Sequence, residues 1–175
     1  MEPNMSEKMN IPIITIIGKS GSGKTTLLER LIVELKRRNY RVGSIKHHSH
    51  AGFEIDHSGK DSWRHAQAGS DHVVIAAPDK IASYRLLDRE LTLDEISTEF
   101  VDVDIILTEG YRQAGKPTLE IVRAETGLDL ISSPEQIFAW VADVPLDEEV
   151  PQFEPDDITG MVDLVVDRFL TKPSK

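Results

Sequence analysis

The sequence predicts an α/β fold with a mainly parallel sheet and helices on both faces. Short aliphatic runs, typical of buried strands, alternate along the chain with segments whose apolar residues recur at helical spacing. A glycine-rich segment follows the first aliphatic run and precedes the first helical segment. Ligands of such sheets bind beyond the carboxyl ends of the strands, so this turn is the first candidate site.

The first half of the chain begins with a strand, a loop and a helix. The strands are recognised as aliphatic runs, and the first helix repeats leucine or isoleucine every three or four positions. The next segment is polar and shows no period, and a short helix after it ends near Gly69. Expected elements are strand 11–17, helix 27–39, strand 41–46, loop 47–59, helix 60–69, strand 72–77 and a less buried strand 81–87.

The second half repeats the alternation. Thr92 and Glu95 have the spacing of a capping box, which predicts a short helix before an aliphatic strand. Asp156 or Asp157 caps a last helix whose apolar positions recur up to Phe169. Expected elements are helix 92–100, strands 103–107, 118–123 and 137–142, and helix 158–169.

Length and composition favour a single domain over residues 11–170, which would be a P-loop nucleotide-binding domain. A chain of 175 residues with 39% hydrophobic residues can bury roughly two thirds of its unfolded surface. The polar ends, residues 1–10 and 171–175, are expected to be disordered tails.

Charge and cysteine content restrict the partners. The chain carries 30 acidic and 20 basic residues, a formal net charge of −10, which argues against nucleic acid or an anionic membrane as the main partner. It has no cysteine, which excludes disulfides and thiolate metal sites. The first apolar run is too short for a signal peptide or a membrane span, so we expect a cytoplasmic protein.

The segment GKSGSGKT at 18–25 satisfies the pattern G-x-x-x-x-G-K-[ST]. Its position between a strand and a helix is that of a P-loop, in which backbone N–H groups and a helix N-terminus hold phosphates. A P-loop lysine bridges the β- and γ-phosphates and the following hydroxyl binds Mg²⁺, so the sequence predicts a P-loop NTPase fold. The expected nucleotide-binding residues are Gly18, Lys19, Ser20, Gly21, Ser22, Gly23, Lys24, Thr25 and Thr26.

Lys19 occupies the second position of the motif. Some dimeric P-loop proteins use a lysine there to reach the phosphates of the neighbouring subunit. A solvated lysine beside an anion site is the simpler interpretation, and the sequence leaves both open.

A P-loop site needs an acid at the tip of a neighbouring strand to hold magnesium. Glu109 follows the aliphatic strand VDIIL and is the expected magnesium ligand and catalytic acid, together with Thr25 as metal ligand. Asp104, at the start of the same strand, lies at the wrong end of the sheet. Asp143 follows the strand IFAWVA and is a candidate for reading the guanine edge, although a capping or solvated aspartate fits the sequence equally well.

The segment 46–65 holds five of the six histidines. Neutral imidazoles with a carboxylate can bind zinc or nickel. Alternatively, the loop handles anions, with Lys46, Lys60 and Arg64 facing phosphates and Asp56 near magnesium. A solvated polar loop is the third interpretation that the sequence leaves open.

Arg112 and Lys116 follow Glu109 closely. They could form a positive rim for a second anionic molecule beside the nucleotide, or be ordinary surface cations.

Five motifs in this order resemble the molybdopterin-guanine dinucleotide biosynthesis protein B (MobB) family. They are GKSGSGKTTLLERLI, IKHHSH, GKDSWRHAQAG, ILTEGYR and VADVP. The resemblance implies a homodimer built through an extended sheet, and binding of GTP and Mg²⁺ with at most weak hydrolysis. It also implies an adaptor role beside the guanylyltransferase (MobA-type) that attaches GMP to molybdopterin, with molybdopterin as a second partner. The signature loop of the family corresponds to Lys46, His48, Asp56, Lys60 and Asp61.

Other P-loop functions stay as alternatives. A small-molecule kinase would use the same phosphate site, but kinases of this architecture usually have several lid arginines, and only Arg112 and Lys116 lie in a comparable place. The histidines favour a nickel-delivery GTPase, whereas the missing cysteines argue against it. GMP transfer by this chain is disfavoured because that reaction attacks the α-phosphate, while a P-loop secures the β and γ groups.

Overall fold

The computed structural model describes residues 11–48, 52–146 and 149–170. The described residues form two compact units, one up to His47 and from Thr92 onward, the other from His48 to Leu91. We describe each unit by itself, and the expectation of one domain over 11–170 stays a prediction.

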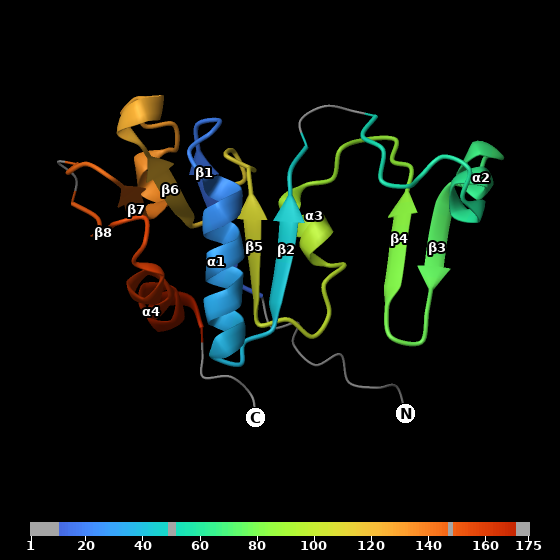
Figure 1. Cartoon of the computed structure of the whole chain (residues 1–175), viewed down its shortest axis with the longest axis horizontal. Helices are drawn as coiled ribbons and strands as arrows, with labels where there is room; N and C mark the ends of the chain where they lie inside the picture. The colour runs from blue at the N-terminus through green and yellow to red at the C-terminus, as the bar shows by residue number, and fades with distance from the viewer. Residues whose placement is uncertain (1–10, 49–51, 147–148, 171–175) are drawn as a thin grey trace. The chain divides into compact units, whose positions relative to one another are not determined.

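A six-stranded parallel sheet forms the first unit (Figure 1), in the order β2-β5-β1-β6-β7-β8. The strands are β1 (Ile13–Gly18), β2 (Val42–Lys46), β5 (Ile105–Glu109), β6 (Thr118–Val122), β7 (Ile137–Ala142) and β8 (Gln152–Phe153). The helices are α1 (Lys24–Arg37), α3 (Leu93–Ser97) and α4 (Ile158–Phe169), with short 3-10 turns η1 (Ala124–Thr126) and η2 (Pro134–Gln136). The predicted α/β class with a mainly parallel sheet is confirmed.

Helices α1 and α4 cover one face of this sheet. The leucines of α1 that recur every four residues, Leu27, Leu31 and Leu35, are buried against alternate residues of the strands. Met161, Val162 and Val165 of α4 join the same core. Burying each such side chain stabilises the fold by roughly 1.5–3 kcal/mol, which is why the helical spacing in the sequence identified this face.

Helix α3 covers part of the opposite face. Leu93 is buried against Ile13 and Ile106, whose side chains point away from α1. Thr92 and Glu95 form the expected capping box, with each side chain bonded to the other residue's backbone N–H. The prediction of helices on both faces is therefore confirmed.

The centre of this second face carries buried polar residues, beside an apolar cluster that contains Val122 and Trp140. Thr15, Thr108, Thr118 and Glu120 are all buried there, and the Thr15 and Thr118 hydroxyls lie 2.8 Å apart in a hydrogen bond. The Glu120 carboxylate accepts hydrogen bonds from the backbone N–H groups of residues 131 and 132, at 2.8 and 3.0 Å. These bonds fix the segment between β6 and β7 on the sheet.

The second unit contains helix α2 (Asp61–Gln67) and an antiparallel pair, β3 (His72–Ala76) and β4 (Ile81–Arg85). Both strands were expected, but they form a separate two-stranded sheet instead of extending the parallel one. The four residues between them are enough for a hairpin, whereas a parallel connection needs a crossover of a dozen or more residues.

The sequence did not indicate β8, η1 or η2. Each has only two or three residues, too few to show a period. Within the described residues, no helix has the length and apolar character needed to cross a membrane.

Glu34 bonds two arginines, of which Arg38 connects α1 with α4. It accepts two hydrogen bonds from Arg37, both at 2.7 Å, and one from Arg38 at 2.8 Å. Arg38 also donates to Asp163 of α4 at 2.5 Å. The hydrogen bonds from Arg37 and then Arg38 lower the pKa of Glu34 from 4.5 to about 2.

Replacing Glu34→Gln should lower the melting temperature at about pH 7, by an amount that shrinks in acid. A carboxylate whose folded pKa is depressed stabilises the fold above its unfolded pKa, here 4.5, and loses this effect as the pH falls through about 2. Thermal unfolding followed by circular dichroism should therefore show the two melting temperatures converging between those values. Glu29→Gln, on an exposed part of α1, serves as the control and should have little effect. A gap that stays constant through this window would contradict the ion-pair account.

Candidate nucleotide-binding site

The P-loop leaves β1 and turns tightly against β6. A Cβ atom on Gly18 would lie 2.6 Å from Ser22 Oγ and 2.9 Å from the Ile121 carbonyl oxygen, so only glycine fits there. Gly21 and Gly23 have left-handed φ angles of 79° and 91°, which favour glycine. The backbone therefore requires or favours glycine at three positions of the motif.

Helix α1 begins directly after this turn. Lys24 is its first residue, and its ammonium donates hydrogen bonds to the carbonyls of Gly18 at 2.9 Å and Lys19 at 2.7 Å. These bonds hold the ammonium over the loop. Ser20, Thr25 and Thr26 are exposed beside it. The loop thus presents a helix N-terminus and a fixed cation at one place, as binding of a phosphate group requires.

Glu109 lies beside the P-loop, as its position in the sequence predicts. Thr25 Oγ1 donates a hydrogen bond to Glu109 Oε2 at 2.8 Å, and Lys46 Nζ donates to Oε1 at 3.3 Å. Lys46 and Glu109 are paired in the parallel register of β2 with β5. The structure therefore brings together three of the expected site residues, a hydroxyl, a carboxylate and an ammonium.

Asp104 lies at the opposite end of β5. It accepts hydrogen bonds from the backbone and guanidinium of Arg41, and the guanidinium bond is the main cause of its lowered pKa. This ion pair accounts for Asp104 without any role in the site.

Arg123 is a residue of this edge that the sequence analysis missed. It follows β6, and its Nε donates to the Ser22 carbonyl at 3.4 Å. Its Nη1 lies 3.7 Å from Asp143 Oδ2, while Asp143 Oδ1 accepts from the Ala124 N–H at 2.9 Å. Arg123 thus joins the P-loop to the carboxyl end of β7. Its place directly after the aliphatic run TLEIV was the available signal.

Lys19 makes an ion pair within its own chain. Its ammonium lies 2.8 Å from Asp129 Oδ2, and this hydrogen bond and charge lower the pKa of Asp129. A Cβ on Gly127 would approach Lys19 Nζ to 2.9 Å, so the loop after η1 packs closely on this side chain. A role of Lys19 on a nucleotide, in either subunit, stays a prediction.

The histidine-rich segment is divided between the two units. The rings of His47 and Tyr111 lie 4.5 Å apart next to Glu109. His48 and Asp56 belong to the second unit, where the Asp56 carboxylate accepts from the His57 N–H at 2.8 Å and the Tyr84 hydroxyl at 3.1 Å. Hydrogen bonding, chiefly from Ser62, lowers the pKa of Asp56.

The expected roles of these residues therefore stay predictions. Among the described residues, no group of three or more histidine, aspartate or glutamate side chains could hold a metal ion. Arg64 pairs with Asp61 at 3.7 Å, and Lys116 pairs with Asp94 at 2.5 Å. His50 lies outside the described residues.

Comparison with known families identifies the kind of protein. The family model MobB, molybdopterin guanine dinucleotide synthesis protein B, matches residues 13–143. The chain belongs to the MobB family. The match contains the P-loop, Glu109, Arg123 and Asp143, and the resemblance stated from the sequence motifs is confirmed.

Individual relatives cover nearly the whole chain. The molybdopterin-guanine dinucleotide biosynthesis adapter protein of Haemophilus influenzae is 36% identical over 89% of this chain and 88% of its own length. The protein of the same description from Escherichia coli is 31% identical, covering 93% and 96%. A crystal structure of Bacillus subtilis MobB is similar with a TM-score of 0.72 and 26% identity, covering 93% and 99%. The fold is thus that of MobB proteins.

Proposed function

We propose that this chain is a guanine-nucleotide-binding adapter in the synthesis of molybdopterin guanine dinucleotide. The observation that carries the proposal is the contact of Thr25 with Glu109 beside the P-loop, in a chain of the MobB family. Relatives 31–36% identical to it over most of its length are named adapter proteins of this synthesis. The partner is then the guanylyltransferase that joins GMP to molybdopterin.

The P-loop edge fits Mg²⁺ with the β- and γ-phosphates of GTP. Magnesium prefers oxygen ligands, and Thr25 and Glu109 supply a hydroxyl and a carboxylate that lie in contact. Lys24 would bind the phosphate oxygens, and Mg²⁺ would neutralise their charge. Glu109 is also the candidate catalytic residue for GTP hydrolysis. This hydrolysis is expected to be weak, because an adapter does not require fast turnover of GTP.

Guanine selection is assigned to Asp143. A carboxylate accepts hydrogen bonds from the N1–H and the amino group that guanine places side by side, whereas adenine offers no such pair of donors. Asp143 follows β7 and is joined to the P-loop through Arg123. The carboxylate retains free lone pairs beside its bonds to Ala124 and Arg123, so it can accept from a base.

A homodimer is supported by the second unit. An isolated two-stranded hairpin is at best marginally stable, and β3 and β4 expose several large apolar side chains, Ile81 by 72% of its surface. A second copy of the chain would complete this sheet. We further propose that the protein works in the cytoplasm, in line with its lack of cysteine and its acidic composition.

The adapter assignment predicts a nucleotide-dependent complex. The immobilised chain with Mg·GTP should capture a purified molybdopterin guanylyltransferase and raise its rate of dinucleotide formation. Lys24→Ala should reduce both effects at least about tenfold, because it removes the cation that binds the phosphates. Lys36→Ala, at an exposed position of the same helix, should leave them unchanged.

Binding of Mg·GTP without capture or stimulation would contradict the adapter role. Transfer of phosphate to a small acceptor would instead establish a kinase.

Two substitutions in the nucleotide site should each remove a different property, the preference for guanine or the effect of Mg²⁺ on affinity. In calorimetric titrations the wild-type chain should bind GTP more tightly than ATP, and Asp143→Asn should shift the preference toward XTP, whose base offers an acceptor where guanine has a donor. Glu109→Gln should reduce the gain in affinity that Mg²⁺ provides by about tenfold or more, because it removes a charged ligand.

Asp104→Asn is the matched control, since Asp104 pairs with Arg41 at the other end of β5. It should leave both nucleotide preference and Mg²⁺ dependence intact. Equal affinities of the wild type for GTP and ATP would remove the guanine assignment, and an unchanged magnesium effect in Glu109→Gln would remove the role of Glu109.

The dimer predicts a mass of twice 19.6 kDa in sedimentation equilibrium. Ile81→Lys should produce monomers, because a charge on a strand opposes pairing with another chain. Val33→Lys is the control at an equally exposed apolar residue of α1, and its mass should stay that of the wild type. A monomeric wild type would contradict the proposal.

A further inference from the structure

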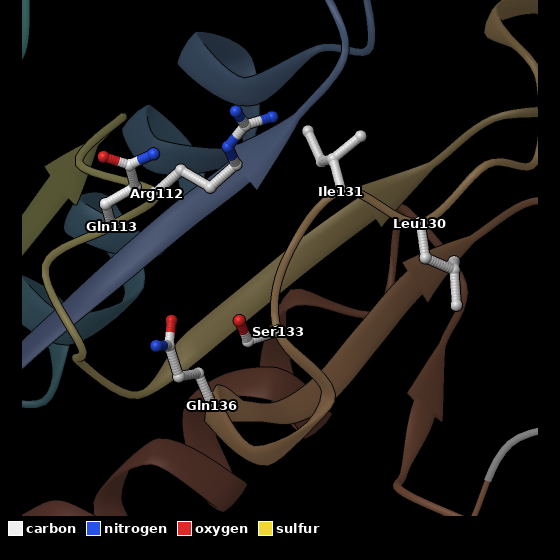
Figure 2. Close-up of a pocket in the computed structure, with 6 residues that line it drawn as sticks. All are labelled: Arg112, Gln113, Leu130, Ile131, Ser133 and Gln136. Atoms are coloured by element: carbon white, nitrogen blue, oxygen red, sulfur yellow. The ribbon is translucent and has the colours of Figure 1, made fainter.

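A pocket lies on the face of the sheet opposite to α1 (Figure 2). Two segments line it: the loop after β5 provides Arg112 and Gln113, and the segment before β7 provides Leu130, Ile131, Ser133 and Gln136. Its volume is about 570 Å³. This lies within the range of roughly 300–1,000 Å³ that is usual for small-molecule sites, but the pocket is partly open to solvent and its lining is mainly polar.

The first wall is positioned by an uncommon turn. Gly110 and Tyr111 have left-handed φ angles of 99° and 60° directly after Glu109. Such a conformation is costly for tyrosine, and strain of this kind is concentrated at functional sites. The turn directs the chain back so that the Arg112 side chain extends over β1, as Figure 2 shows. Glu109, the magnesium candidate at the end of β5, is thus followed three residues later by Arg112.

The second wall of the pocket is held in place by a side chain of the sheet. The buried Glu120 carboxylate binds the backbone N–H groups of Ile131 and Ser132, so these residues are held at the pocket. Buried polar groups almost always have partners, yet Ser132 Oγ and Trp140 Nε1 have none among the described residues. Trp140 pairs in register with Glu120 and therefore faces the same side of the sheet. The sheet beneath the pocket therefore combines the Glu120 carboxylate with an apolar cluster that contains Val122 and Trp140.

The lining side chains offer a specific combination of chemistry. Arg112 has no hydrogen bond or ion pair to any described residue, in contrast to Lys116, which Asp94 holds at 2.5 Å. Gln113 and Gln136 provide two carboxamides, each with an acceptor and two donors. Leu130 and Ile131 add apolar surface, as Figure 2 shows. A ligand that matches these side chains has an anionic group, an edge with amide-like donors and acceptors, and an apolar part.

We propose that this pocket binds a pterin that carries an anionic group. Arg112 binds the anion in the bidentate manner that guanidinium favours, the carboxamides bond the amide and amino groups of the pterin edge, and Leu130 and Ile131 contact the ring. The choice of a pterin rests on the proposed function, because an adapter of this synthesis meets two ring systems and the P-loop accounts for the nucleotide. The pocket itself is independent of that choice.

The test is a fluorescence titration of the full-length chain with pterin-6-carboxylate. Saturable binding is expected, and Arg112→Gln should weaken it about tenfold or more because a charged hydrogen-bond donor is lost. The neutral probe 6-hydroxymethylpterin should bind the wild type more weakly by a similar factor. Lys116→Gln, in the same loop but paired with Asp94, is the matched control and should bind like the wild type.

A second measurement locates the ligand. The side-chain amide resonances of Gln113 and Gln136 should shift on addition of pterin-6-carboxylate, and those shifts should disappear in Arg112→Gln. Mg·GTP affinity is measured on the same samples. It should be unchanged in Arg112→Gln, which also shows that the variant is folded.

The outcomes separate the two proposals. No saturable binding to the wild type, equal binding to Arg112→Gln, or equal competition by inorganic phosphate would overturn the pterin site, even with GTP binding intact. Pterin binding that depends on Arg112 in a chain that fails to bind GTP would support the pocket and overturn the nucleotide assignment.

Discussion

The parallel alignment of β1 with β5 and β6 is the constraint on which the candidate site depends. Parallel strands bring their carboxyl ends to one edge, and the register here pairs Ile16 with Glu109 and Gly18 with Ile121. The P-loop therefore leaves β1 between an acid-bearing strand end and a backbone carbonyl that only glycine can approach. A shift of β5 by one residue would reverse the faces of its side chains and separate Glu109 from Thr25.

The two faces of the sheet serve different purposes. One face is closed by the leucines of α1 and the apolar residues of α4, which gives the rigid support that a phosphate loop needs. The other face carries threonines and Glu120 across its centre, and loops rather than a long helix lie over it. Because such polar groups require partners, their burial fixes the covering segment by hydrogen bonds. This explains how a loop can form a defined wall of a pocket without packing as a helix would.

Local pattern was sufficient to predict the longer helices and strands and the principal contact of the site. Thr25 and Glu109 were expected together because each follows a buried strand by a short, recognisable spacing, and strand ends meet at one edge. The ion pair of Lys19 with Asp129 could not be foreseen, because 110 residues separate the two and no period relates them. Arg123 was missed for a similar reason: its partners, Ser22 and Asp143, become neighbours only when β6 lies between β1 and β7. The separate β3–β4 sheet was not predicted. The alternation of strands and helices favoured one parallel sheet, whereas the short connection between β3 and β4 decides for a hairpin.

The cations of this edge are already engaged by the chain itself. Lys24 bonds two P-loop carbonyls, while Lys46, Lys19 and Arg123 are matched with Glu109, Asp129 and Asp143. In a protein of net charge −10, many acidic side chains compete for each cation. These contacts keep the cations beside the P-loop. An incoming polyphosphate must exchange some of these partners, so its affinity is the difference between new and replaced interactions. When a phosphate takes over one of these cations, the carboxylate that was paired with the cation is released and can move. Arg123 connects the phosphate loop to Asp143, and Glu109 connects it to the loop that carries Arg112. A ligand that displaces these contacts at the P-loop therefore acts, through Arg123 and Glu109, on the segments that follow β7 and β5.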